Sequence, residues 1–83
     1  MQTFTKRILV EGGFTLAFFF TKIYSMRGVR FHICVIDIED RAHNFNMELK
    51  NLEWKIIDAP KVADWIINVE PSFQQAVLEN TVD

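Results

Sequence analysis

Apolar and polar residues alternate along much of the chain up to residue 57, which is typical of strands that bury one side of a sheet. The alternation is interrupted by glycine, asparagine or charged residues, which favour turns. It predicts five strands, at residues 3–10, 14–25, 29–38, 44–50 and 52–57. Because the connections between them are short, neighbouring strands should pair antiparallel in a meander sheet of four or five strands. Lys6 and Arg7 in the first strand suit a sheet edge, since charged side chains discourage pairing with another chain.

The positions of the turns predict the register between strands. We expect two-residue turns at 27–28 and 50–51 and a three-residue connection at 40–42. These turns predict three cross-strand pairs, namely Tyr24 with Phe31, Asp37 with Phe45, and Leu49 with Leu52. The register keeps apolar residues on the same side of the sheet from strand to strand. A shift by one residue would move every side chain of a strand to the other face.

The alternation divides the strand residues between two faces of the sheet. Face A carries Leu16, Phe18, Phe20, Tyr24, Phe31, Ile33, Val35, Phe45, Met47, Leu49, Trp54 and Ile56. Face B carries Ala17, Phe19, Thr21, Ile23, His32, Cys34, Ile36 and Ile38. Both faces are rich in apolar residues, whereas an antiparallel sheet wetted on one side has one apolar and one polar face. Something must therefore cover the second face.

A helical region is predicted at residues 60–80. Asp58 or Ala59 provides the cap, and Pro60 suits the first turn. Apolar residues recur at spacings of three and four, which predicts an apolar stripe of Val62, Trp65, Ile66, Val69, Phe73, Ala76 and Val77. Pro71 interrupts this stripe, so we expect one kinked helix or two short helices that meet there and pack on face A. The predicted fold class is therefore α+β.

Composition limits the remaining possibilities. A chain of 83 residues is expected to form a single domain, 1–83. The single cysteine, Cys34, excludes an internal disulfide, so a cytoplasmic location is expected. No apolar run approaches the ~20 residues that cross a bilayer, and we expect no membrane partner. Eleven acidic residues against nine basic ones weigh against a nucleic-acid-binding protein, whose surface is usually basic.

Residues that could support catalysis or metal binding are few. His32 and Cys34 lie two apart on one face of a predicted strand, but a zinc site needs three or four ligands, and His43 is expected at the far end of the hairpin. Asp37, Glu39 and Asp40 form an acidic group that is expected to be a solvated loop. If Asp37 lies on face A, it needs a hydrogen-bonding partner. We therefore expect no catalytic residue, no cofactor and no metal, and a protein that is not an enzyme.

Face B provides the functional hypothesis. Its apolar band consists of Phe19, Ile23, Cys34, Ile36 and Ile38, and a polar rim surrounds it, as at protein interfaces. We expect a homodimer, or another protein partner, on this face. Three alternatives remain. The first strand or second helix could cover face B. Single-stranded nucleic acid could bind the sheet through Lys22, Arg27, Arg30 and Arg41. A small apolar ligand could bind between sheet and helix, near Tyr24, Phe31, Trp54 and Trp65.

Overall fold

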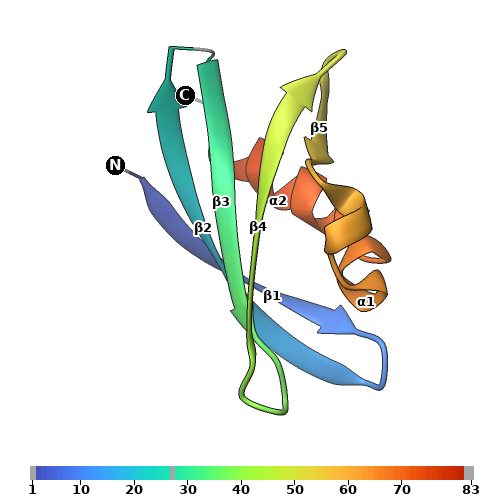
Figure 1. The fold of residues 1–83 in the computed structure, drawn as a ribbon. Coiled ribbons are helices and arrows are strands. Elements are labelled where there is room, and N and C mark those ends of the chain that lie inside the picture. Colours follow the sequence, from blue (N-terminus) through green and yellow to red (C-terminus); the bar gives the residue numbers. More distant parts are fainter. Residues whose placement is uncertain (1, 27, 82–83) are drawn as a thin grey trace.

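The computed structural model describes residues 2–26 and 28–81. They form one antiparallel sheet in the order β1-β2-β3-β4-β5, followed by short helical elements (Figure 1). The strands are β1 (Thr3–Val10), β2 (Phe14–Ser25), β3 (Gly28–Ile36), β4 (Ala42–Lys50) and β5 (Glu53–Ile56). The helical elements are the 3-10 helix η1 (Ala59–Lys61), α1 (Asp64–Ile67) and α2 (Glu70–Thr81). The predicted α+β meander is confirmed.

β1 is an edge strand that pairs with β2 along its whole length, from Thr3 opposite Thr21 to Val10 opposite Phe14. The connection needs glycine, because Gly12 and Gly13 have φ angles of 89° and 83°, which residues with a Cβ rarely adopt. The register turns the even-numbered residues of β1 towards face A. Its buried apolar residues therefore extend the core at the sheet edge.

The predicted register between β2 and β3 is wrong by two residues. Ser25 pairs with Gly28, so Phe31 lies opposite Lys22 and not opposite Tyr24. Gly28, which we expected in the turn, belongs to β3 and has a φ angle of 116°. The Ser25 hydroxyl donates a hydrogen bond of 3.0 Å to the carbonyl oxygen of Gly28. A shift by two residues leaves each side chain on its predicted face, so the error does not disturb the core.

The connection between β3 and β4 has the predicted length but lies two residues earlier in the chain. β3 ends at Ile36, two residues early, and Phe45 lies opposite Ile33 and not opposite Asp37. The Asp37 carboxylate holds this loop, because its Oδ1 accepts hydrogen bonds from the backbone N–H groups of Glu39 at 2.8 Å and Arg41 at 3.0 Å. A side chain that caps loop backbone in this way stabilises a connection that strand alternation does not reveal.

The β4–β5 turn is also displaced from its predicted position. Asn51 and Leu52 occupy it with φ angles of 51° and 69°, as the two-residue hairpin turn with positive φ at both positions requires. Leu49 therefore faces Trp54 and not Leu52. The shift is again by two residues, so Trp54 and Ile56 stay on face A and are buried there.

Face A forms the core with the helices. Phe73 of α2 lies over the middle of the sheet, with ring centroids 4.9 Å from Phe18, 5.4 Å from Phe45 and 6.2 Å from Phe20. All four rings are buried. The predicted helical stripe is correct in its buried members Ile66, Phe73, Ala76 and Val77, whereas Val62, Trp65 and Val69 are only half-buried. The latter three belong to the short segment before α2, near the end of the sheet.

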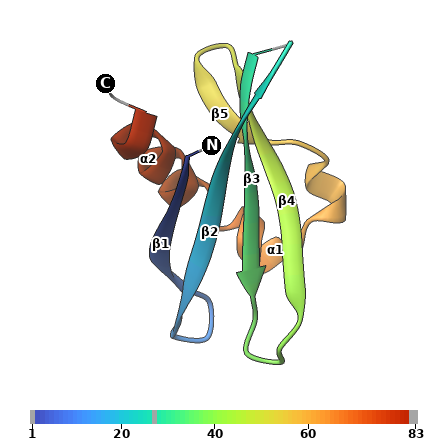
Figure 2. The same ribbon diagram turned by 90° about the vertical axis from the view of Figure 1, so that its left-hand side faces the viewer.

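Pro71 lies in the first turn of α2 and does not kink it. At this position its missing N–H removes no helical hydrogen bond. Of the two predicted outcomes, the structure has two short helices, α1 and α2. The predicted position of both on face A is confirmed, and the alternative in which β1 or the second helix covers face B is wrong. Figure 2 views the sheet from face B, with no helix in front of β2, β3 and β4.

α2 also links the two edges of the sheet. Glu70 Oε2 accepts a hydrogen bond of 2.8 Å from the backbone N–H of Ile56, and Gln74 Nε2 donates one of 2.9 Å to the carbonyl oxygen of Trp54. Both backbone groups lie on the outer edge of β5, so two helix side chains occupy an edge that would otherwise be open. At the opposite edge, Lys6 Nζ of β1 lies 3.5 Å from Glu79 Oε1.

Candidate protein interface

The centre of face B is a row of residues, one from each of four strands. Phe19 lies opposite Thr5 on one side and Cys34 on the other, and Cys34 lies opposite Asn44. Neighbouring strands are ~4.8 Å apart, so these side chains lie close enough to form a continuous surface. Arg7, Ala17, Ile36 and Ala42 lie one step further along their strands on the same face.

The apolar residues of this surface are partly open to solvent. The exposed fractions of Phe19 and Ile36 are 49% and 50%, although their neighbours Phe18 and Val35 are completely buried on face A. Cys34 and Ile23 are half-buried. Because the helices lie behind the sheet in Figure 2, nothing in the described part of the chain packs on this surface.

Polar residues continue face B towards the β4–β5 turn. Thr21, His32 and Asn46 form one row across the strands, and Arg30, Glu48 and Lys55 form the next. The second row alternates in charge. Lys55 Nζ also lies 3.1 Å from Glu53 Oε2, and this hydrogen-bonded ion pair raises the pKa of Lys55 above its usual range. An apolar centre with a charged border is the arrangement that the sequence predicted.

Four of the five predicted band residues, Phe19, Ile23, Cys34 and Ile36, lie on face B. Ile38 does not, because β3 ends at Ile36 and Ile38 belongs to the loop that Asp37 holds. Ile38 instead lines a small cleft with Trp65 at the end of the molecule. The early end of β3 could not be read from the alternation, since Ile38 continues the apolar pattern.

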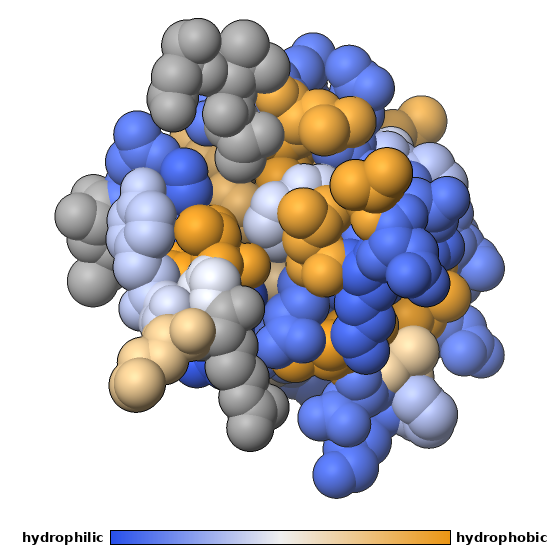
Figure 3. All heavy atoms as spheres, turned by 90° about the horizontal axis from the view of Figure 1, so that it is seen from above, coloured by the Kyte–Doolittle hydropathy of each residue, from blue (hydrophilic) through white to orange (hydrophobic). Residues whose placement is uncertain are grey.

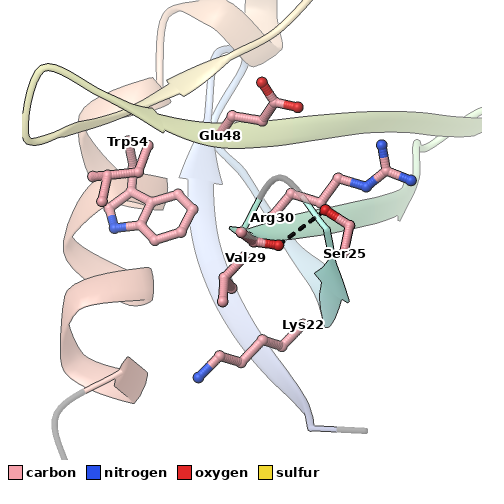
Figure 4. A pocket seen from close by; sticks show the side chains of 8 residues that line it. Lys22, Ser25, Val29, Arg30, Glu48 and Trp54 are labelled. Carbon is pink, nitrogen blue, oxygen red and sulfur yellow. Dashed lines mark hydrogen bonds between the residues drawn. The ribbon is translucent and has the colours of Figure 1, made fainter.

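The residues considered for nucleic-acid binding do not form one surface. Lys22 and Arg30 line a groove of about 420 Å³ between the β2–β3 and β4–β5 hairpins. Figure 4 shows them on either side of Val29, with Trp54 across the groove. Arg41 lies at the opposite end of β3, where its Nη2 is 3.3 Å from Glu39 Oε2. Arg27 lies outside the described residues.

The possible metal and catalytic residues are also separated. His32 and Cys34 share face B, whereas His43 lies opposite Val35 and therefore on face A. Within residues 2–26 and 28–81, no three side chains of His, Cys, Asp or Glu gather closely enough to hold a metal ion. Cys34 would need a base beside it to act as a nucleophile, and His43 cannot serve because it lies on the other face of the sheet.

Sequence reasoning missed the partner of Asp37. His43 Nε2 donates a hydrogen bond of 2.8 Å to Asp37 Oδ2, and the His43 ring meets the Trp65 ring edge-on at 5.2 Å. The hydrogen bond from His43 lowers the pKa of Asp37 below its usual value, and the hydrogen bond from the backbone N–H of Arg41 lowers it by a smaller amount. The only feature of the sequence that pointed to this contact was the six-residue spacing between Asp37 and His43 across a loop.

The space between the middle of the sheet and α2 is filled, which counts against an apolar ligand at that place. Phe31 and Trp54 are buried and meet edge-on at 5.1 Å. Tyr24 does not join them, because it lies near the β2–β3 turn, exposed, with Lys22 Nζ 5.3 Å from its ring. Trp65 contacts His43 instead. The four aromatic residues considered for a ligand pocket therefore lie in three separate places.

Comparison with protein-family models, with curated proteins and with solved structures found no match. In the part of the chain that the structure describes, no helix is long and apolar enough to cross a membrane. The proposals that follow therefore depend on the surfaces of the molecule, and on face B first, because it carries half-exposed Phe19 and Ile36.

Proposed function

We propose that this chain is a non-catalytic protein-interaction domain that forms a homodimer by packing face B against face B of a second copy. The observation that carries the proposal is the half-exposure of Phe19 and Ile36 at the centre of a sheet face that no helix covers. Burying such residues against another sheet removes apolar area from water and stabilises the pair by roughly 25 cal/mol per Å². A reducing, cytoplasmic setting suits Cys34, which has no cysteine partner in the chain.

The dimensions of the molecule suit this arrangement. Its Cα positions extend over 36 × 26 × 19 Å, and a rectangle with the two longer extents as its sides has an area of about 900 Å². A stable interface buries roughly 800 Å² on each partner. A two-fold axis in the plane between the sheets would bring Phe19 and Ile36 of both copies together. The alternating charges of Arg30, Glu48 and Lys55 can meet opposite charges across that axis.

Molar mass in solution tests the proposal, measured by light scattering over a hundredfold range of concentration. At high salt, which screens any contact between the charged ends of the molecule, we expect wild-type dimer, a monomeric Ile36→Glu variant, and a dimeric Leu78→Glu variant. Leu78 is the matched control because it is 52% exposed on α2, away from face B. Circular dichroism should be unchanged in both variants. A wild-type monomer at every concentration, or an unfolded Ile36→Glu variant, would contradict the proposal.

A second candidate function is the binding of single-stranded nucleic acid in the groove of Figure 4. The observation in its favour is that Lys22 and Arg30 flank this groove, so two basic side chains are available to contact phosphates. Titration with an unstructured oligonucleotide at several salt concentrations tests it. Binding that weakens with salt, and weakens further in Lys22→Gln, would support this function, whereas no binding at low salt would remove it.

A further inference from the structure

The two ends of the molecule along its 36 Å axis carry opposite charge. The end with the β2–β3 and β4–β5 turns holds four basic and two acidic residues, Lys22, Arg30, Lys50, Lys55, Glu48 and Glu53, without counting Arg27, which lies outside the described residues. The opposite end, counted over the β1–β2 and β3–β4 connections and the same number of flanking strand residues, holds four acidic and two basic residues, Glu11, Asp37, Glu39, Asp40, Arg7 and Arg41. The overall charge of −2 is therefore distributed unevenly, with one positive and one negative end.

The basic end also carries apolar side chains at its furthest points. Leu52 is 93% exposed at the β4–β5 turn, and Met26 is fully exposed beside the β2–β3 turn. The β3–β4 register ends at Arg30 opposite Glu48, so these two hairpin tips separate beyond it. Figure 3 views the molecule from this end and shows hydrophobic residues gathered there among hydrophilic ones. We call the tips with their flanking residues the basic tip.

Leu52 is in an unfavourable position for its residue type. Its φ angle of 69° is in the left-handed region, where the second residue of this turn is usually glycine. An exposed leucine there is unfavourable both for its backbone and for its hydration. Strained residues of this kind concentrate at sites of contact, so Leu52 is a candidate anchor for a partner.

The acidic end has a cleft of a different kind. Its volume is about 180 Å³, roughly that of six water molecules at ~30 Å³ each, which is enough for one aliphatic side chain. Its apolar lining consists of Val10, Phe14, Leu16, Ile38 and Trp65, and Glu11, Asp37 and Glu39 complete it. Every charged residue of the lining is acidic. We call this feature the acidic cleft.

We propose that the basic tip of one copy docks in the acidic cleft of the next, with Leu52 as its anchor. Both surfaces are apolar at their centres and their charged borders have opposite sign, so the two surfaces are electrostatically complementary. The contact joins different patches of two identical chains, and a head-to-tail contact of this kind repeats into an open chain of copies unless the rotation closes a ring. It does not depend on face B pairing, because neither Leu52 nor the lining of the cleft belongs to the apolar band of face B, whereas Arg30, Glu48 and Lys55 border both surfaces.

Complementing variants test the proposal in a background that lacks face B pairing. Leu52→Gly removes the anchor, and it should fold at least as well as the wild type because glycine suits the positive φ angle. Ile38→Lys places a positively charged side chain in the cleft. Ile38 is exposed and lies in the β3–β4 loop. Both are made on Ile36→Glu. Each variant alone should be monomeric, and an equimolar mixture should form a one-to-one dimer and nothing larger, because only one intact tip and one intact cleft remain.

Three results would overturn the proposal. In the first, Ile36→Glu is monomeric at every concentration at low salt, where the attraction between the ends is least screened. In the second, Ile36→Glu associates but the mixture of the two variants does not. In the third, the mixture stays monomeric while phosphatidylserine vesicles bind wild-type protein and not Leu52→Gly, which would assign the basic tip to a lipid surface. Failure of face B pairing gives a different result, because Ile36→Glu would then associate as the wild type does.

Discussion

His43 and Asp37 hold the β3–β4 loop by a hydrogen bond of 2.8 Å between Nε2 and Oδ2. The same carboxylate accepts two backbone N–H groups of the loop through its other oxygen. The loop is therefore organised around one ionised side chain. It also forms one wall of the acidic cleft, so its geometry affects the proposed head-to-tail contact.

Stability should depend on the ionisation of Asp37. Its pKa is lowered in the folded protein, chiefly by the His43 hydrogen bond. A carboxyl group with a lower pKa when folded stabilises the protein above its unfolded pKa of about 4, and this contribution is lost as the pH falls through the folded pKa. The free energy of unfolding, measured by urea titration at a series of pH values, should fall in acid more steeply for wild type than for Asp37→Asn. Asp40→Asn, in the same loop, is the control and should keep the wild-type slope.

Replacing Leu52 with glycine should stabilise the isolated fold. Glycine adopts the φ angle of 69° without steric cost, and the expected gain in unfolding free energy is about 0.5–1 kcal/mol. Leu49→Gly is the matched control, because Leu49 is an exposed leucine within β4, where glycine should destabilise by a similar amount. Thermal unfolding of both variants measures the difference. A lower melting temperature for Leu52→Gly would show that the leucine makes contacts within the monomer.

Removal of the Phe73 ring should be among the most damaging single changes. Phe73 is completely buried against Phe18, Phe20 and Phe45, so Phe73→Ala should lower the unfolding free energy by about 3–5 kcal/mol. Trp65→Ala should cost less, because Trp65 is only half-buried. Urea unfolding monitored by circular dichroism compares the two variants, because this signal does not depend on tryptophan fluorescence. Equal losses would mean that α1 contributes as much to the core as α2.

The contact between α2 and the β5 edge should contribute both stability and solubility. Glu70→Ala leaves the backbone N–H of Ile56 without its 2.8 Å partner, and we expect a loss of about 1–2 kcal/mol. The Ile56 amide should then exchange its hydrogen faster, and the opened edge should increase aggregation. Glu79→Ala is the control, since the exposed Lys6–Glu79 pair at 3.5 Å should contribute less than 1 kcal/mol. Unchanged exchange at Ile56 in Glu70→Ala would contradict the role of this contact.

The sequence alone determined an antiparallel meander of four or five strands and the face of nearly every residue in β2 to β5. The reason is that alternation has a period of two, and each register error was by an even number of residues. Phe19, Cys34 and Ile36 were therefore placed correctly on face B, whereas their neighbours in the sequence lie on face A, in the core.

Only the tertiary structure decided the turns and the relationships that depend on them. The β3–β4 loop begins two residues early because Asp37 binds loop backbone and His43, and the β4–β5 turn is displaced because Asn51 and Leu52 adopt positive φ angles. These are interactions of single side chains and backbone angles, which leave no periodic pattern. Likewise, the hairpin connections bring basic residues together at one end of the molecule and acidic residues at the other. Charges distant in the sequence become neighbours only when the sheet is formed.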